Sequence, residues 1–303
     1  MKGFATGFLN FILSLSIAAL GLAFMLNVTV LNPDFVIAEL DKIDPYSLVK
    51  EQAAEQLTEQ LPPEFEFMSG AIEKTFTDLE PWLKAQVNSS IYSFYDYILG
   101  KSESLSIVIT TEPIKESLKD NLWEALQESP PPELAGLPPA MVEQYFNQLY
   151  EQEIASQIPS TFNLASLIPA EVMGILEQVR QYAGYVQIAL KGLIALTIAL
   201  IAGIILLKRE VRGSARMLGK TFLVYGAIGY GGIFAVKHFA GPQIAQLGYG
   251  LPSQLQTMIP QLLDDLVAPL QMFTLGFLIA GIALVVVSKV YKPRRPIPES
   301  ESP

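Results

Sequence analysis

Paired carboxylates are the side chains in this sequence with the clearest capacity for acid–base chemistry. Glu64 lies two residues before Glu66, and Asp78 lies two residues before Glu80. Two carboxyl groups held at a fixed separation can divide the roles of general acid and general base, as they do in glycoside hydrolysis. A chain segment this rich in acidic residues contains such pairs by chance, so a solvated acidic face is the better interpretation.

The motifs that would make an enzymatic assignment specific are absent from the sequence. It contains no Gly-x-Ser-x-Gly or His-Glu-x-x-His motif, no Gly-x4-Gly-Lys phosphate-binding loop and no EF-hand loop. There is no cysteine and only one histidine, which excludes disulfides and thiolate nucleophiles and removes most zinc sites. We therefore expect a protein that is not an enzyme, with no catalytic residue, no cofactor and no bound metal.

Four apolar runs are each long enough to cross a lipid bilayer, for which a helix needs about 20 residues. We expect transmembrane helices at residues 1–31, 182–207, 221–240 and 269–289. The first run is longer than the roughly 7–15 apolar residues of a cleavable signal peptide and lacks a small-residue cleavage pattern, so we interpret it as an uncleaved signal anchor. The composition agrees, because only 17% of the residues are charged, against about 25% in a typical soluble domain.

Positive charges in short connections predict the orientation of the spans. The expected topology anchors are Lys208, Arg209, Arg212, Arg216 and Lys220 in a basic loop at 208–220, and Lys292, Arg294 and Arg295 in a tail at 290–303. Both segments and the N-terminus are then cytoplasmic, and residues 32–181 are extracytoplasmic. Residues 31–181 contain 25 acidic and 8 basic side chains, a net charge of −17, whereas the remainder of the chain is +7. The absence of cysteine and of signal cleavage favours a prokaryotic plasma membrane.

The long acidic insert has the periodicity of helices. Apolar residues recur every three or four positions from Phe65 to Ile98, which predicts an amphipathic helix that Pro81 interrupts and Gly100 ends. Further helices are predicted at 44–61, 113–128 and 140–157, and Pro169 is expected to open a helix that continues into the second span. The predicted fold class is all-α: a four-transmembrane-helix bundle with a large helical extracytoplasmic domain inserted between spans one and two.

Two segments of the chain fit this scheme less simply. Residues 105–111 have strand character, and two interpretations remain open: a connector over the helical core, or an edge that pairs with another chain or a peptide. Residues 241–268 are apolar at helical spacing, and Pro252 and Pro260 are expected to divide them into short pieces. We expect this amphipathic outer segment to lie along the membrane surface or to pack beneath the large domain.

Small residues in the spans predict close helix packing, because lipid supplies no hydrophobic drive and small side chains let helix backbones approach. The alternative for the same residues is a dimer interface. The expected packing positions are Ala195, Ala199, Gly203, Gly226, Gly229, Gly232, Gly276 and Ala280.

The centres of the spans contain no ionisable residue, which argues against a pump, a proton-coupled carrier or a voltage sensor. The favoured function is a non-enzymatic anchor or scaffold of the cell envelope whose outer domain binds a protein, peptide or lipid-like partner, which requires an apolar groove on that domain. The alternative is an oligomeric transport or channel component, which requires a continuous polar path, and a membrane-embedded enzyme ranks third. The expected partners are the lipid bilayer and either another protein or further copies of the chain, with no nucleic acid.

Overall fold

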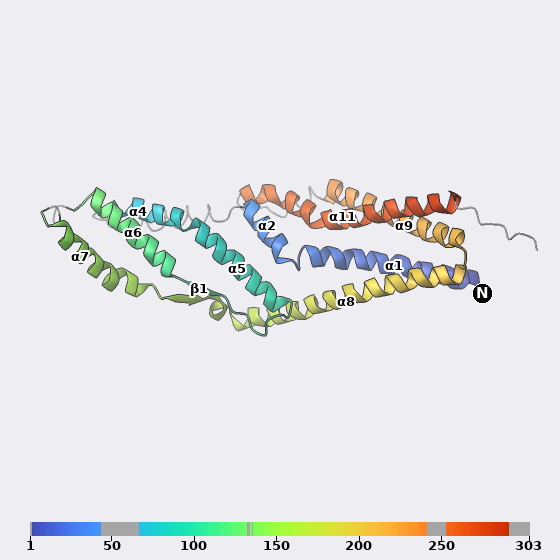
Figure 1. Ribbon diagram of the computed structural model, residues 1–303, viewed down its shortest axis with the longest axis horizontal. Helices are drawn as coiled ribbons and strands as arrows, with labels where there is room; N and C mark the ends of the chain where they lie inside the picture. Colours follow the sequence, from blue (N-terminus) through green and yellow to red (C-terminus); the bar gives the residue numbers. More distant parts are fainter. Residues whose placement is uncertain (1, 44–66, 132–133, 135, 241–252, 291–303) are drawn as a thin grey trace, which may run out of the picture. The chain divides into compact units, whose positions relative to one another are not determined.

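The structure, a computed structural model of the chain, describes residues 2–43, 67–131, 134, 136–240 and 253–290 (Figure 1). These residues are almost entirely helical, with two strands of three residues each. The predicted all-α fold class is therefore confirmed. The predicted helix at 44–61 lies outside the described residues.

Four helices of the described chain are long and apolar enough to cross a membrane, which is the pattern of a multi-pass membrane protein. They are α1 (Lys2–Val28), α8 (Ala170–Lys208), α9 (Val211–Ala235, continued by a π-helical turn) and α11 (Ser253–Val290). The helix expected to open after Pro169 and to enter the second span without a break is α8. Its 39 residues give a length of about 58 Å, almost twice the roughly 30 Å of a bilayer's hydrocarbon core.

Two connections differ from the sequence-based expectation. The basic loop expected at 208–220 is reduced to Arg209 and Glu210, because α9 begins at Val211 and no proline follows in that range to interrupt it. The outer segment expected at 241–268 is not separate over its described part, because α11 runs unbroken from Ser253 through Pro260 and Pro269. A proline removes only one backbone hydrogen bond, and a helix packed against neighbours tolerates that loss.

The chain divides into two compact units, which we call the span unit (residues 1–35 and 182–303) and the insert unit (residues 36–181). In the span unit, α9 and α11 run antiparallel and side by side (Figure 1). A Cβ atom added to Gly226 would lie 2.5 Å from the backbone nitrogen of Leu278, and one added to Gly219 would lie 2.9 Å from that of Val285. Gly281 of α11 faces α9 in the same way, so the two helices are in backbone contact.

Side chains make further contacts between the helices of the span unit. Ser16 of α1 and Thr197 of α8 share a buried hydrogen bond of 2.8 Å between their hydroxyl oxygens. Phe222 of α9 packs edge-on against Phe277 of α11, with 4.9 Å between the ring centroids. The central cluster joins α1, α8 and α9 and consists of Leu13, Ile17, Leu200, Ile204, Leu218 and Phe222.

The insert unit contains α4 (Phe67–Asp78), α5 (Glu80–Ile98), α6 (Glu112–Glu128) and α7 (Pro139–Leu149). The predicted interruption near Pro81 is confirmed, because α4 and α5 separate at Leu79 and Pro81 occupies the first turn of α5. The predicted end at Gly100 is confirmed as well. Gly100 has φ +72°, a left-handed conformation that closes the helix and that residues with a Cβ rarely adopt.

The strand candidate at 105–111 finds its partner within the insert unit. Strand β1 (Val108–Thr110) pairs antiparallel with β2 (Thr161–Asn163), with Ile109 opposite Phe162. Strand β1 is therefore paired within this chain and is not a bare connector, while β2 covers only one of its two edges, so pairing of the other edge with a further chain stays a prediction. Because β2 has three residues and no alternating pattern of its own, the sequence did not predict it.

Helix α7 agrees with the predicted helix at 140–157 but does not stay regular to its end. It continues into a π-helical turn at Tyr150–Ile154 and then a 3₁₀ turn at Ala155–Gln157. The wider π turn changes the direction in which the side chains after Leu149 point. Tyr150, four residues after the inward-packing Phe146, lies in the core of the insert unit, where it is 1% exposed.

Candidate functional site

Tyr150 is the centre of the packed core that positions α6 and α7. Its hydroxyl donates a 2.6 Å hydrogen bond to the backbone oxygen of Lys115, in the first turn of α6. Its ring stacks on Phe146 of α7, with 6.0 Å between centroids, and Phe146 in turn lies 5.2 Å from the ring of Trp123. These contacts hold α7 beside α6, with Leu122 buried between them.

Helix α6 is also fixed to α4, by polar contacts and through Ala71 of α4, which lies in the same buried cluster as Leu122 and Tyr150. The side-chain amide of Asn121, which is 5% exposed, donates to Asp78 Oδ2 at 3.0 Å and lies 3.2 Å from Thr75 Oγ1. At the surface, Lys74 forms an ion pair with Glu124, and this hydrogen bond raises the pKa of Lys74. Helix α6 is therefore packed against α4 and against α7.

An apolar groove of about 330 Å³ lies between α6 and α7, at the low end of the size range of ligand pockets. Glu153, at the rim, is the one charged residue among its lining. The other residues that shape it include Leu122, Leu126, Tyr145, Phe146, Leu149 and Ile154. This is the apolar groove that a partner-binding insert requires.

The apolar surface of α7 extends beyond the groove. Met141, Tyr145 and Leu149 are spaced by four residues and are 57%, 56% and 45% exposed, while Phe146 and Tyr150 on the adjoining face pack inward. Scattered exposed hydrophobic side chains are ordinary, but a row at helical spacing beside an apolar hollow is typical of an interaction surface. Helix α7 therefore presents apolar side chains both to its own core and to the outside.

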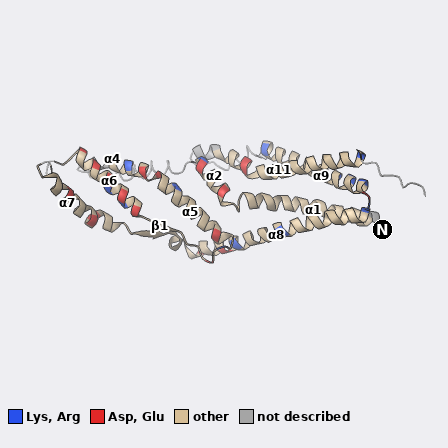
Figure 2. Ribbon diagram, in the orientation of Figure 1, with Lys and Arg blue, Asp and Glu red and all other residues tan. Residues whose placement is uncertain are grey.

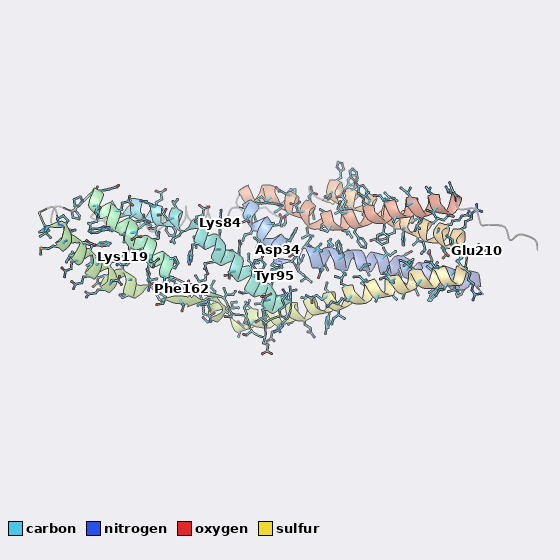
Figure 3. The ribbon with its side chains drawn as sticks, in the orientation of Figure 1. Asp34, Lys84, Tyr95, Lys119, Phe162 and Glu210 are labelled. Carbon is cyan, nitrogen blue, oxygen red and sulfur yellow. The ribbon has the colours of Figure 1, made fainter. Side chains whose placement is uncertain are left out.

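The surroundings of the groove are acidic. Figure 2 shows acidic residues, coloured red on the ribbon, spread over the helices of the insert unit, in agreement with the net charge of −17 for residues 31–181. Lys119 of α6 pairs with Glu151 at 3.1 Å, and its ammonium lies 5.6 Å from the centre of the Tyr150 ring (Figure 3). Burial, with a smaller contribution from neighbouring carboxylates, raises the pKa of Tyr150 to about 12, so this hydroxyl stays neutral at physiological pH.

The carboxylate pairs considered for acid–base chemistry have structural roles where they are described. Asp78 accepts a hydrogen bond from Asn121, and Glu80 forms an ion pair with Lys84 at 3.0 Å. Glu64 and Glu66 lie outside the described residues. In the described ranges, no group of three or more His, Asp or Glu side chains is arranged to hold a metal ion.

The small residues expected to pack the spans fall into two groups. Gly226 and Gly229 lie in the contact between α9 and α11, and Ala280 packs against the central cluster. A Cβ atom added to Gly203 would lie 4.0 Å from Cδ1 of Leu9. The others are exposed, namely Ala195, Ala199, Gly232 and Gly276. Sequence reasoning missed Gly219 and Gly281, although the spacing of seven residues between Gly219 and Gly226 is a signal that could have found the first.

The expected topology anchors lie mainly on the surface of the span unit. Arg212 donates from Nε to the backbone oxygen of Ser288 at 3.1 Å, which ties the start of α9 to the end of α11. Lys208, Arg209, Arg216 and Lys220 are exposed. The remaining three anchors, Lys292, Arg294 and Arg295, lie outside the described residues.

Comparison with known proteins does not assign this chain to a family. No protein-family model, no curated protein and no solved structure matches it significantly.

Proposed function

We propose that this protein is a non-enzymatic integral membrane protein of the cell envelope whose insert unit binds an amphipathic helix of another protein. The observation that supports this proposal is the apolar groove between α6 and α7. An amphipathic helix laid with its apolar face in a hydrophobic groove is a recurring mode of protein recognition.

A helix suits this surface better than a single acyl chain. The groove holds about 330 Å³, and Tyr145 and Leu149 belong to its lining, whereas Met141, in the same row on α7, lies outside it. An acyl chain would fill the groove and leave Met141 in water. A helix with apolar residues three and four positions apart would cover the groove and the row together.

The negative charge of the insert indicates the charge of its partner. With a net charge of −17 over residues 31–181, the insert attracts a helix whose polar face is basic, and such complementarity raises the association rate and lowers affinity for acidic competitors. Glu153 at the groove rim is positioned to meet a basic flank. The proposed partner is therefore a basic amphipathic helix.

The proposal includes the orientation predicted by the basic residues, with the insert outside a prokaryotic plasma membrane and both termini inside. Single cysteines test it cleanly because the chain has none of its own. Glu103 and Glu210 are both exposed. We expect Glu103→Cys to react with a membrane-impermeant maleimide in intact cells and Glu210→Cys only after permeabilisation. The reverse labelling pattern would overturn the topology.

The groove is tested with the full-length protein in phosphatidylcholine nanodiscs and a fluorescent probe peptide, an 18-residue helix with a leucine face and a lysine face. Anisotropy titrations with empty nanodiscs supply the background. We expect Leu149→Glu to weaken binding about tenfold, because it places a carboxylate in the apolar contact. The matched control is Gln148→Glu, which adds the same charge to the same exposed helix outside the groove lining.

Two results would count against the proposal. Equal affinities of the Leu149→Glu and Gln148→Glu variants would exclude the groove as the binding surface. Complete displacement of the probe by dodecanoic acid at micromolar concentration would identify a lipid-like occupant instead of a helix. A peptide with glutamate in place of lysine should bind more weakly than the basic probe, and equal binding would remove the argument from charge.

A further inference from the structure

A second hollow lies in the span unit, between α1 and α9, and it is independent of the groove in the insert. Its volume is about 510 Å³. Its lining is polar at one end, where Asn10, Ser14, Lys220 and Thr221 lie, and mainly apolar at the other, where Ala18, Val224 and Ile228 lie. The two helices run in the same direction here, because Asn10 contacts Thr221 and Gly21 lies beside Tyr225.

The polar end has more hydrogen-bond donors than acceptors. The hydroxyl of Thr221 shares its one proton between Asn10 Oδ1 at 2.6 Å and the backbone oxygen of Met217 at 3.1 Å, and the hydroxyl of Ser14 donates to the backbone oxygen of Asn10 at 3.1 Å. The Asn10 side-chain amide carries two further N–H donors, and within the described chain no acceptor is assigned to them. Lys220 adds an ammonium that is exposed and makes no ion pair with a described residue. The unmatched donors fit an anion with several oxygen atoms.

Lys220 lies at the polar end of the groove and directly before the apolar part of α9. It is the last of three basic residues spaced by four positions, after Arg212 and Arg216, and the apolar run of the span begins directly after it. Lysine side chains at the ends of membrane helices extend to the headgroup layer. The polar end of the groove is therefore expected at headgroup level, with the apolar end deeper in the bilayer.

The apolar end is open to lipid rather than closed by protein. Val224 is 53% exposed and Ile228 is 70% exposed, and both line the groove. A molecule held at Lys220 and Asn10 would find an apolar channel between α1 and α9 that is continuous with the bilayer. This arrangement has the polarity of a phospholipid, with a charged group at one end and a hydrocarbon chain at the other.

We propose that the groove between α1 and α9 binds one anionic phospholipid, with its headgroup phosphate at Lys220 and Asn10 and one acyl chain along Ala18, Val224 and Ile228. Basic pockets between membrane helices are known to hold anionic headgroups. The phosphate oxygens accept from the Lys220 ammonium and the Asn10 amide, and the chain replaces solvent or disordered lipid along the apolar wall.

Native mass spectrometry of the detergent-purified full-length protein tests this site by counting bound lipids as phosphatidylglycerol or phosphatidylcholine is added with identical acyl chains. We expect one phosphatidylglycerol to bind more tightly than any phosphatidylcholine. The Lys220→Gln variant should lose about fivefold in that affinity, the effect of one lysine near an anionic lipid surface. The Asn10→Ala variant should weaken the same single site.

The matched control is Arg216→Gln, which removes one positive charge a single turn earlier on α9 and outside the groove lining. It should leave the tight site intact. Equal losses in Lys220→Gln and Arg216→Gln would overturn the proposal, because they would show attraction by net charge alone. Displacement of the lipid by millimolar inorganic phosphate would also overturn it, since the site would then recognise a free anion without its chain. Neither outcome affects the helix-binding groove of the insert.

Discussion

Helices α9 and α11 of the span unit approach until their backbones touch at glycines, with Phe222 and Phe277 packed beside that contact, whereas α4, α6 and α7 of the insert unit are held together by large and polar side chains. Gly226 leaves no room for a Cβ beside Leu278, while Tyr150 and Asn121 each bridge two elements of the insert. The physical reason is the surroundings expected for each unit, lipid around the spans and water around the insert. Lipid supplies no hydrophobic drive, so close backbone approach must stabilise the contact, but in water the burial of large side chains does so.

The comparison implies that the two units respond to opposite kinds of mutation. The contact between α9 and α11 should lose most stability when atoms are added, because its backbones already touch. The insert unit should lose most stability when atoms or hydrogen bonds are removed, because its core depends on a few side chains that connect two elements. The following variants test this contrast in order of expected effect.

The largest effect is expected from Gly226→Leu in the contact between α9 and α11. The new Cβ alone would lie 2.5 Å from the backbone nitrogen of Leu278, so the helices must separate, at a cost of about 3 kcal/mol or more. We expect a large drop in the apparent melting temperature measured by size-exclusion chromatography after heating in detergent. Gly232→Leu on the same helix meets nothing within 4 Å and should melt like the wild type. Similar losses in both variants would contradict backbone contact at Gly226.

The next effect is a loss of insert stability at alkaline pH. The pKa of Tyr150 is raised to about 12 in the folded chain, so the folded state keeps its proton when the unfolded state loses it near pH 10. Stability is then fully present below pH 10 and falls by about 1.4 kcal/mol per pH unit from pH 10 toward 12. Urea unfolding followed by tryptophan fluorescence measures it. The slope should flatten in Tyr150→Phe and persist in Tyr145→Phe, whose side chain is exposed.

A smaller effect is expected from Asn121→Ala, which removes the amide that links α6 to α4. The buried Thr75 and the Asp78 carboxylate lose a donor, at a cost of about 1–2 kcal/mol. The urea midpoint of the insert should fall accordingly, and Gln127→Ala, an exposed amide on the same helix, should leave it unchanged. An unaltered midpoint in Asn121→Ala would mean that side-chain packing alone holds α4 to α6.

The smallest effect is expected from Ser16→Ala and Thr197→Val in the span unit. Their shared hydrogen bond of 2.8 Å is buried, but such bonds in membranes average only about 0.6 kcal/mol. A double-mutant cycle of unfolding in mixed micelles measures the coupling. A coupling of several kcal/mol would contradict the comparison of the two units, because polar side chains would then contribute as much to stability among the spans as in the insert.

The helices could be predicted from the sequence because their information is local. The apolar spacing from Phe65 to Ile98, the break near Pro81 and the end at Gly100 all follow from neighbouring residues. Strand β2 could not be predicted in this way, because three residues become a strand only when β1 lies beside them. Pro260 was misleading for the related reason that a helix with packing partners tolerates a proline.

The sequence predicted that the insert would carry an apolar groove, but it did not predict which helices form that groove. The sequence places apolar residues on more than one side of 140–157, and only packing against other elements of the insert unit decides which of them turn inward. Phe146 and Tyr150 pack inward, whereas Leu149 is 45% exposed. In the same way, glycine in the spans predicted close packing, but the choice of α11 as the partner of Gly226 is a property of the assembled bundle.

In the short turn between α8 and α9, Arg209 combines a left-handed backbone conformation with a positive charge. Arg209 has φ +51°, the one non-glycine residue in the described chain with a positive value, and a left-handed conformation costs such a residue about 1–2 kcal/mol. Glycine would relax the backbone but would remove a positive charge that orients the nascent chain on the proposed topology. We expect Arg209→Gly to raise the melting temperature slightly and to increase the fraction of inverted molecules. Arginine at this position then serves biosynthetic insertion, at the expense of the finished hairpin.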